Sequence, residues 1–453
     1  MHIFALLFFQ AFASSPNSDS EILGSDGPWN IFGVSGYAGT ITMNALTRSS
    51  IFYWMFEAID GNITSDSLPL MIWLFGGPGC SGSEAMIWEY ISPIHLYPTG
   101  QPGRTPLELT WGTDFHILSI DFPYGTGYSY ANSPGDNKNT TLGATYYLWQ
   151  FLNKLNAKYP TWFKREVYIF GESYGGHWVP GIAYNILIQN ALNPTGFVIN
   201  LKGIGLGDPW VHPPTGFVIN LKGIGLGDPW VDPASQTQSY STFGVSNSLI
   251  NEYQQSIINL YQNQISGFLK SGQLDNASAT WENLMATFIS FSQVNKYDIR
   301  TFVEYDFDDV ATFMNSQSTR NLLNAPSFIS WVDCNQTVFQ YYQGDIMNST
   351  LPLVEYVLSQ NVSVIIYQGQ DDLIVPTTST QAMISKINWS GALNFTNSPK
   401  VNWIVNGTLA GYAQSYSYLT FVSILGSGHM TDYYQPYNVK QMVLNFANAN
   451  EWN

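Results

Sequence analysis

The sequence predicts an α/β fold, with a central, mostly parallel sheet flanked by helices and a helical cap inserted into it. Short, strongly apolar runs bounded by Gly, Pro or Asp are typical of strands that are buried on both faces. Such runs occupy residues 70–75, 116–122, 166–170 and 362–367. Helical patterns lie between them at 142–155 and from 176 to about 192. Because strands alternate with helices, the sheet should be mostly parallel.

The helical cap is predicted from a change of pattern between about residues 248 and 325. Apolar side chains there follow helical spacing, and no strand pattern separates them. They are Ile250, Tyr253, Ile257, Tyr261 and Ile265, then Trp281, Leu284, Met285, Phe288 and Ile289. We therefore expect the α/β body to occupy 14–231 and 331–453, with the cap at 232–330 between its two parts.

The composition excludes two classes of protein. The chain has 453 residues with 16 Lys and Arg against 32 Asp and Glu, so its net charge is −16. Binding to nucleic acid needs clusters of Lys and Arg, and we therefore expect no nucleic-acid partner. At 45% hydrophobic and 15% aromatic residues, the chain carries enough apolar surface to fold. Its length suits either two or three average domains or one large α/β unit with an insertion.

The first 13 residues have the pattern of a secretory signal peptide. An apolar run at 3–9 precedes Ala11-Phe12-Ala13, a small-x-small site of the kind that signal peptidase cleaves. The run is far shorter than the ~20 apolar residues that span a bilayer, and no later stretch reaches that length. We expect a secretory-pathway protein without a membrane anchor, located in the lysosome or vacuole or outside the cell.

Sequons and cysteines agree with that compartment. Nine Asn-x-Ser/Thr sequons are candidates for glycosylation, of which we expect about half to be used. They are Asn62, Asn139, Asn276, Asn335, Asn348, Asn361, Asn388, Asn394 and Asn406. The two cysteines, Cys80 and Cys334, are far apart in sequence. The simple interpretation is one disulfide closing a long loop, worth ~4 kcal/mol by chain entropy, and the alternative is two separate buried thiols.

An internal duplication complicates the middle of the chain. Residues 194–211 recur without a change at 214–231. Two copies are too few for a solenoid, so an unchanged copy implies either a very recent duplication or an error in assembling or splicing the sequence. The repeated segment has the pattern of a strand followed by a Gly-rich turn. One position in a sheet holds only one copy, and the other must form a loop or pair at an edge.

A candidate nucleophile lies at Ser173, in the segment Gly171-Glu172-Ser173-Tyr174-Gly175. The segment follows the predicted strand 166–170 and opens a helical pattern, which is the context that a nucleophile elbow requires. Small residues on either side permit the tight turn that lifts the serine Oγ clear of the sheet. The free N–H groups at the helix start favour negative charge.

A nucleophile elbow needs a general base, and the chain has only six histidines. Five are set aside: His2 lies in the signal, His212 lies in the duplication where the other copy has Asp232, His177 is one turn past the serine on its own helix, and His95 and His116 precede the serine. His429 remains, in the Gly-flanked turn 426–430, and it fits the chain order serine, acid, histidine.

The acid of the triad should end a strand between Ser173 and His429. The predicted strand 362–367 is followed by Asp371 and Asp372. Either carboxylate can orient an imidazole and stabilise its charged form. The pattern alone does not choose between them.

Several sequence blocks together resemble the serine carboxypeptidases of the lysosomal and vacuolar type, which have the α/β-hydrolase fold. The blocks are IWLFGGPGCSG at 72–82, DFPYGTGYSY at 121–130 and GESYGGHWVP at 171–180, followed by GQDDLIVP at 369–376 and GSGHM at 426–430. The resemblance covers nearly the whole chain after residue 13. It implies a serine-type carboxypeptidase that acts on peptides and needs neither a cofactor nor a metal.

The resemblance also assigns roles to residues. It implies Ser173, Asp372 and His429 as the catalytic triad, and the backbone N–H groups of Gly77 and Tyr174 as the oxyanion hole. It strengthens the pairing of Cys80 with Cys334, whereas the additional bridges that the family has in its cap are absent from this sequence.

Recognition of the substrate's C-terminal carboxylate is implied for three further residues. In the family, the counterpart of Glu172 binds that carboxylate as a protonated acid, which requires acidic pH, and Gly76 and Trp73 belong to the same site. A Glu close to another carboxylate should indeed have a raised pKa.

One position departs from the family pattern. Phe75 stands where the family has Asn or sometimes Gln as a partner of the substrate carboxylate. Losing such a contact to a charged group costs ~1.5–3 kcal/mol, so we expect weak carboxypeptidase activity or a preference for esters, amides or acyl transfer. A secreted esterase or acyltransferase and a non-catalytic binding homologue are therefore the alternative functions. The sequence leaves a homodimer open.

Overall fold

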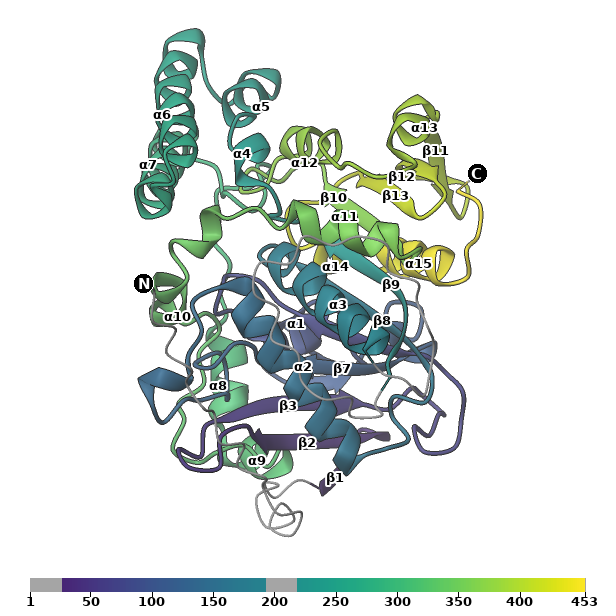
Figure 1. Cartoon of the computed structure of the whole chain (residues 1–453). Helices are drawn as coiled ribbons and strands as arrows, with labels where there is room; N and C mark the ends of the chain where they lie inside the picture. The colour runs from purple at the N-terminus through teal and green to yellow at the C-terminus, as the bar shows by residue number, and fades with distance from the viewer. Residues whose placement is uncertain (1–26, 193–217, 453) are drawn as a thin grey trace, which may run out of the picture.

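A computed structural model describes residues 27–192 and 218–452. Within them, 11 strands form one sheet in the order β1-β2-β3-β7-β4-β8-β9-β10-β13-β12-β11 (Figure 1). The strands are β1 (Gly27–Ile31), β2 (Val34–Thr42), β3 (Ser50–Phe56), β4 (Leu70–Leu74), β7 (His116–Ile120), β8 (Glu166–Glu172), β9 (Asn220–Gly227), β10 (Ser363–Gly369), β11 (Val401–Val405), β12 (Thr408–Tyr416) and β13 (Leu419–Ile424). A separate pair consists of β5 (Ile94–Leu96) and β6 (Pro102–Arg104).

The middle of the large sheet is parallel and both of its edges are antiparallel. Strands β7, β4, β8, β9, β10 and β13 pair in parallel. The hairpin strands β1 to β3 add antiparallel pairs on one side, and β12 and β11 do so on the other. The predicted fold class is thereby confirmed, and the four predicted apolar runs correspond to β4, β7, β8 and β10.

Helices cover both faces of the sheet. They are α1 (Gly82–Trp88), α2 (Thr141–Lys158), α3 (Gly175–Ala191), α4 (Pro233–Gln236), α5 (Tyr240–Ser246), α6 (Glu252–Lys270), α7 (Leu274–Ser292), α8 (Asp308–Asn315), α9 (Gln317–Leu322), α10 (Gln336–Tyr341), α11 (Leu351–Ser359), α12 (Thr377–Ile384), α13 (Ala392–Asn397), α14 (Thr431–Tyr434) and α15 (Pro436–Ala447). Short 3-10 turns lie at Trp111–Thr113, Pro134–Asp136 and Asp345–Met347.

The two faces of strand β4 show how the core is divided. Leu70, Ile72 and Leu74 belong to the hydrophobic cluster that contains α2, α3 and α11. The alternating residues Met71 and Trp73 belong to a second cluster, which contains α1 and α15. Because both faces are buried, β4 is apolar along its whole length, and the same reason explains why such runs were recognisable from sequence.

The predicted cap region, 232–330, divides between two places. Helices α5, α6 and α7 stand away from the sheet, beyond the end of its parallel strands (Figure 1). Helices α8 and α9 lie beside β2 and β3, where Val310, Met314 and Leu323 join the core cluster on that face. The domain boundaries at 231 and 330 stay a prediction.

The second copy of the duplication fills the sheet. Strand β9 comes from that copy and pairs in parallel with β10 on one side and with β8 on the other, where the register shifts between Val167 and Tyr168. Its glycines permit close contacts, because a Cβ at Gly225 would lie 2.2 Å from the Phe170 ring. The first copy, at 194–211, lies outside the described residues, as do the predicted signal peptide at 1–13 and His212.

The structure contains the predicted disulfide, and most of the predicted glycosylation sites are exposed. The Cys80–Cys334 disulfide joins segments 254 residues apart. Eight of the nine sequon asparagines are exposed, whereas Asn335 is partly buried and its Nδ2 donates a hydrogen bond to the Gly125 carbonyl at 2.8 Å. Within residues 27–192 and 218–452, no helix combines the length and apolarity that crossing a membrane requires.

Candidate active site

Ser173 lies in a sharp turn between β8 and α3. Its φ is +60°, a conformation that costs a non-glycine residue backbone strain and that is typical of a nucleophile elbow. Its backbone N–H donates to the Gly227 carbonyl at 2.9 Å, and its carbonyl accepts from the Trp230 N–H at 3.0 Å. Strand β9, which the second copy supplies, therefore holds the elbow in place.

Small residues surround the elbow because its neighbours approach closely. A Cβ at Gly171 would lie 2.3 Å from the Leu74 carbonyl oxygen, and one at Gly176 would lie 2.4 Å from the Trp230 carbonyl oxygen. A Cβ at Gly76 would lie 2.6 Å from the Ser173 Cβ. These positions require glycine, as the elbow interpretation predicts for those beside the serine.

His429 and Asp372 form a buried hydrogen-bonded pair. The imidazole Nδ1 lies 2.7 Å from the Asp372 Oδ2, and both side chains are almost fully buried. The other ring nitrogen, Nε2, is buried without a hydrogen-bond partner among the described residues. Ser173 and His429 line the same cavity.

The structure distinguishes the two adjacent aspartates that the sequence left open. Asp371 is part-exposed and its Oδ2 pairs with the Arg300 Nε at 3.3 Å. Asp372 is buried, and besides His429 it accepts hydrogen bonds from the Val375 N–H at 3.2 Å and the Gln368 Nε2 at 3.1 Å. Only Asp372 contacts the imidazole.

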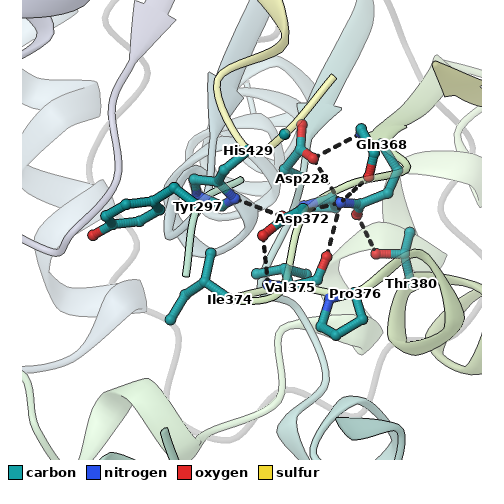
Figure 2. Close-up of polar contacts among 12 residues, drawn as sticks. Asp228, Tyr297, Gln368, Asp372, Ile374, Val375, Pro376, Thr380 and His429 are labelled. Atoms are coloured by element: carbon teal, nitrogen blue, oxygen red, sulfur yellow. Dashed lines mark hydrogen bonds and ion pairs between the residues drawn. The ribbon is translucent and has the colours of Figure 1, made fainter. Parts of the chain in front are cut away.

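The loop around Tyr297 holds the acid and histidine loops together. The His429 N–H donates to the Tyr297 carbonyl at 2.7 Å, and the N–H groups of Leu373 and Ile374 donate to the Lys296 carbonyl. A Cβ at Gly428 would lie 2.2 Å from the Tyr297 carbonyl oxygen, which explains the glycine beside His429. Figure 2 shows the Tyr297 side chain beside the imidazole.

Asp228 is a second buried carboxyl group at the triad, and sequence reasoning missed it. Figure 2 shows the Gln368 amide between Asp228 and Asp372: its Nε2 donates to Asp228 Oδ1 at 2.6 Å. Burial, with the charge of Asp372 adding to it, raises the pKa of Asp228 well above its usual range. A proton held on Asp228 removes the repulsion between two buried carboxylates. Sequence could show only that Asp228 directly follows a predicted strand, because the pairing of that strand, β9, with β10 is established by the fold.

Four neighbouring strands thus position the site residues at the carboxyl-terminal ends of the parallel strands. Ser173, Asp228, Asp372 and His429 follow the carboxyl ends of β8, β9, β10 and β13, which are consecutive in the sheet. Parallel strands bring such loops together even when they are far apart in sequence.

A cavity of about 480 Å³ opens at the elbow. Its lining includes Ser173, His429, Glu172, Gly76 and Phe75, together with residues of α7 from the predicted cap region. Gly77 and Tyr174, the predicted oxyanion-hole residues, also line it. Their backbone N–H groups have no backbone hydrogen-bond acceptor among the described residues, so they are available to a ligand oxygen.

Three buried carboxyl groups cluster beside the nucleophile. Glu89 follows α1, Glu172 ends β8 and Asp432 lies in α14, and their oxygens lie within 4.8 Å of one another. Burial raises the pKa of Glu172 well above its usual range, and the charge of Glu89 raises it further. Burial likewise raises the pKa of Glu89 and of Asp432. The sequence predicted a raised pKa for Glu172, and burial together with the charge of Glu89 accounts for it. Sequence reasoning missed Glu89 and Asp432 themselves.

Two residues near this cluster differ in their access to the cavity. Phe75 is nearly buried but lines the cavity, and it brings no hydrogen-bonding group. Trp73 is fully buried, packs edge-on against Trp111 and is not among the residues that line the cavity. Trp73 packs on Trp111, whose indole partly offsets the raised pKa of Asp432.

The other described histidines are structural, as the sequence favoured for His177. His177 stacks on Tyr174 and its Nδ1 lies 3.0 Å from the Thr141 Oγ1. His116 is buried with its Nε2 2.9 Å from Asp66. His95 stacks on Tyr90, and burial lowers the pKa of its imidazole to about 4.

The fold and site agree with a sequence comparison. The family model for serine carboxypeptidase matches residues 27–218 and 214–449. The chain belongs to the serine carboxypeptidase family. Each matched segment contains one copy of the duplication, so either copy satisfies the family pattern. The protein is accordingly a hydrolase with the α/β-hydrolase fold, as the sequence blocks implied.

Individual relatives support this membership. The chain is 30% identical over 421 residues to a probable serine carboxypeptidase of Dictyostelium discoideum, covering 91% of this chain and 78% of that protein. It is 28% identical to serine carboxypeptidase-like 47 of Arabidopsis thaliana, covering 90% and 78% respectively. The crystal structure of Kex1, a prohormone-processing carboxypeptidase of Saccharomyces cerevisiae, has the same fold with a TM-score of 0.78 at 22% identity, covering 92% of this chain and 91% of that one.

Proposed function

We propose that this serine carboxypeptidase family member releases C-terminal amino acids from peptides through an acyl-enzyme, at acidic pH. The observation that carries the proposal is the pairing of two features in one cavity. Ser173 and the Asp372–His429 pair supply nucleophilic catalysis, and Glu172 supplies a buried carboxyl group beside the nucleophile.

The proposed reaction follows from the positions of these groups. His429 Nε2 takes the Ser173 proton as Oγ attacks the scissile carbonyl, while Asp372 holds the imidazole and stabilises its charge. The N–H groups of Gly77 and Tyr174 bind the oxyanion. His429 then protonates the departing amine, and water hydrolyses the acyl-enzyme by the reverse sequence of proton transfers.

Carboxylate recognition distinguishes an exopeptidase from other hydrolases of this fold. We assign it to the protonated Glu172 and the N–H of Gly76, with Glu89 and Asp432 keeping Glu172 protonated and Trp73 supporting them through Trp111. A protonated carboxyl group donates a hydrogen bond to the substrate carboxylate, whereas an ionised one repels it.

The pH dependence tests this assignment. Because burial raises the pKa of Glu172, the group donates its proton at low pH and loses it as the pH rises. We expect kcat/KM for a free-acid peptide to fall about 10-fold or more as the pH rises through that transition, mainly through KM. The matching peptide amide should lack this fall. Initial rates of both substrates from pH 4 to 8 measure the difference.

Glu172→Gln is the control for this prediction. Its amide donates a hydrogen bond at every pH, so the fall for the free acid should be much reduced. An unchanged pH profile in that variant would assign the transition to another group.

Phe75 supports a second prediction about substrate class. It brings no donor to the place where the family has an amide, so binding of the free carboxylate is weakened. We expect Phe75→Asn to raise kcat/KM about 10- to 100-fold for a blocked dipeptide with a free carboxylate, corresponding to the ~1.5–3 kcal/mol of a hydrogen bond to a charged group. The same variant should gain little on the ester or amide.

Parallel assays with acid, amide and ester substrates provide the measurement. If the wild-type protein already hydrolyses the free acid as well as Phe75→Asn does, the proposed effect of Phe75 is wrong. A preference of the wild type for the ester at every pH would favour the esterase or acyltransferase alternative.

The proposed compartment is the secretory pathway, either the lysosome or vacuole or the extracellular space. A disulfide between distant cysteines is typical of an oxidising environment. Exposed sequons are compatible with glycosylation there, except at Asn335, whose Nδ2 is already hydrogen-bonded. Asp and Glu outnumber Lys and Arg two to one, and acidic pH protonates part of that excess.

A further inference from the structure

Asp228 is a buried carboxyl group that the proposed reaction does not use, although it lies against the triad. It directly follows the carboxyl end of β9, and its side chain is fully buried. One of its oxygens, one oxygen of Asp372 and a ring nitrogen of His429 all lie within 4.8 Å of one another. A group this close to both the acid and the base is placed to influence their proton transfer.

The backbone and a neighbouring amide hold Asp228 in this position. Its φ is +43°, which is uncommon for a residue other than glycine and persists only where the surroundings impose it. Its N–H donates to the Tyr367 carbonyl at 2.8 Å. Its Oδ1 accepts hydrogen bonds from the Gln368 Nε2 at 2.6 Å and from the Gly369 N–H at 2.8 Å (Figure 2).

The two oxygens of Asp228 differ, and the difference locates its proton. Oδ1 accepts two hydrogen bonds, whereas Oδ2 is buried and no N–H or O–H of the described residues donates to it. The side chains of Asp228 and Asp372 also hydrogen-bond each other. Two carboxyl groups can do so only when one of them is protonated. An O–H on Asp228 Oδ2 that donates to Asp372 satisfies all of these contacts.

Asp372 is the member of this pair that carries the charge. It accepts hydrogen bonds from the His429 Nδ1, the Gln368 Nε2 and the Val375 N–H, and three donors stabilise a carboxylate. Burial raises the pKa of both carboxyl groups, and the charge of Asp372 raises the pKa of Asp228 further, well above its usual range. Asp228 is therefore the protonated partner.

The ionisable groups around Asp228 favour the same state. They come from four elements: Glu172 at the end of β8, Tyr367 and Asp372 on and after β10, Asp432 in α14, and His429 after β13. In this set the imidazole is the one group that can become a cation, and it is paired with Asp372. An ionised Asp228 would place a second buried negative charge on that single cation.

We propose that Asp228 is a positioning residue whose proton links it to Asp372, and that this link keeps His429 in its neutral, proton-accepting form under acidic conditions. The inference rests on the proposed function, in which His429 is the base. An imidazole accepts the Ser173 proton only when it is neutral, whereas the charge of Asp372 favours the charged imidazole. A hydrogen bond donated to Asp372 stabilises that carboxylate independently and so weakens its attraction for a proton on the imidazole.

Asp228→Asn and Asp228→Ala provide the test. The asparagine amide donates to Asp372 at every pH, and its oxygen keeps the two hydrogen bonds of Oδ1, whereas alanine removes the donor. On the acidic side, we expect the pH of half-maximal kcat to rise by about 1 unit in Asp228→Ala and to stay within about 0.3 unit in Asp228→Asn. The measurement is hydrolysis of an ester from pH 3 to 8, because an ester has no carboxylate for Glu172 to bind.

Thr380→Val is the matched control. The Thr380 Oγ1 donates to the Gln368 Oε1 at 2.6 Å, so this substitution disturbs the bridging amide without touching either carboxyl group. It should lower Tm and leave the pH of half-maximal kcat unchanged. A shift as large as that of Asp228→Ala would assign the effect to packing around Gln368 and overturn the proposal. A fall of about 1 unit in Asp228→Asn would also overturn it, because Asp228 would then be ionised in the wild type.

Infrared difference spectra locate the proton without any turnover. The wild type at pH 5 should show the carbonyl band of a protonated carboxyl group that Asp228→Asn lacks. Absence of that difference would refute the proton on Asp228, even if Asp228→Ala did not fold.

Titration of the imidazole by ¹⁵N NMR, with its signals assigned by His429→Gln, follows the base directly. Equal titration midpoints in the wild type and Asp228→Ala would refute the effect on His429. Failure to cleave free-acid peptides would count against the proposed carboxypeptidase activity alone, because these measurements use no such substrate.

Discussion

Replacing Ser173 with alanine is expected to lower kcat by about 10⁶-fold, because the replacement removes the nucleophile that forms the acyl-enzyme. Oxyanion stabilisation and substrate binding would remain and account for the residual rate. The measurement is hydrolysis of a blocked dipeptide with a free carboxylate at acidic pH. The wild type should also react covalently with a serine-directed phosphonate at Ser173, whereas the variant should not.

Folding and background reactivity need a control for this prediction. Ser290 lies on the exposed side of α7, where its hydroxyl bonds only to the Thr287 carbonyl. Ser290→Ala should match the wild type in kcat and in labelling. If Ser173→Ala kept more than about 1% of the wild-type kcat, Ser173 would not be the nucleophile. If the wild type showed no turnover and resisted the phosphonate, the non-catalytic alternative would gain support.

The candidate nucleophile and base, Ser173 and His429, could be identified from sequence because their signals are local. Ser173 sits between a buried strand and a helix, among glycines that its neighbours require, and His429 lies in a glycine-flanked turn. Each pattern reflects the immediate backbone, so a window of a few residues contains it. The choice between Asp371 and Asp372 depended on family resemblance, because both follow β10 and only the fold decides which contacts the imidazole.

The cluster of buried carboxyl groups was not predictable in this way, although Glu172 itself was named from the family resemblance. Its partners Glu89 and Asp432 follow α1 and lie in α14, respectively, and nothing in any one segment reveals that their oxygens converge with those of Glu172. Asp228 likewise reaches Asp372 and His429 from a different strand, with one of its oxygens within 4.8 Å of an atom of each. Such sites arise from strand order, which the chain establishes only on folding.

The two hairpins at the antiparallel edges of the sheet differ in their sequence signals: one has a turn pattern that sequence reasoning missed, and the other has none. Asn406 and Gly407 both have positive φ and join β11 to β12, and Asn-Gly between apolar runs is a strong hairpin signal that was available. Phe32 and Gly33 make the equivalent turn between β1 and β2, where Phe is an unusual choice for positive φ. No turn pattern could have located that hairpin.

The second large loss of activity is expected on substitution of Asp372, which is hydrogen-bonded to His429. We expect Asp372→Asn to lower kcat by about 10⁴-fold with little change in KM. The carboxylate of Asp372 accepts hydrogen bonds from three donors: His429 Nδ1, Gln368 Nε2 and the Val375 N–H. An asparagine has only one acceptor oxygen, so its amide nitrogen must face at least one of these donors.

The geometry predicts which donor loses its hydrogen bond in Asp372→Asn. Val375 binds Oδ1, while His429 and Gln368 share Oδ2. If the asparagine oxygen stays with Val375, its amide faces the imidazole, which then keeps its proton on Nε2 and cannot accept the Ser173 proton. Asp371→Asn is the matched control, because its carboxylate pairs with Arg300 at a part-exposed position, and it should keep kcat within about 2-fold. If the adjacent variant lost as much kcat, the assignment of Asp372 as the triad acid would be wrong.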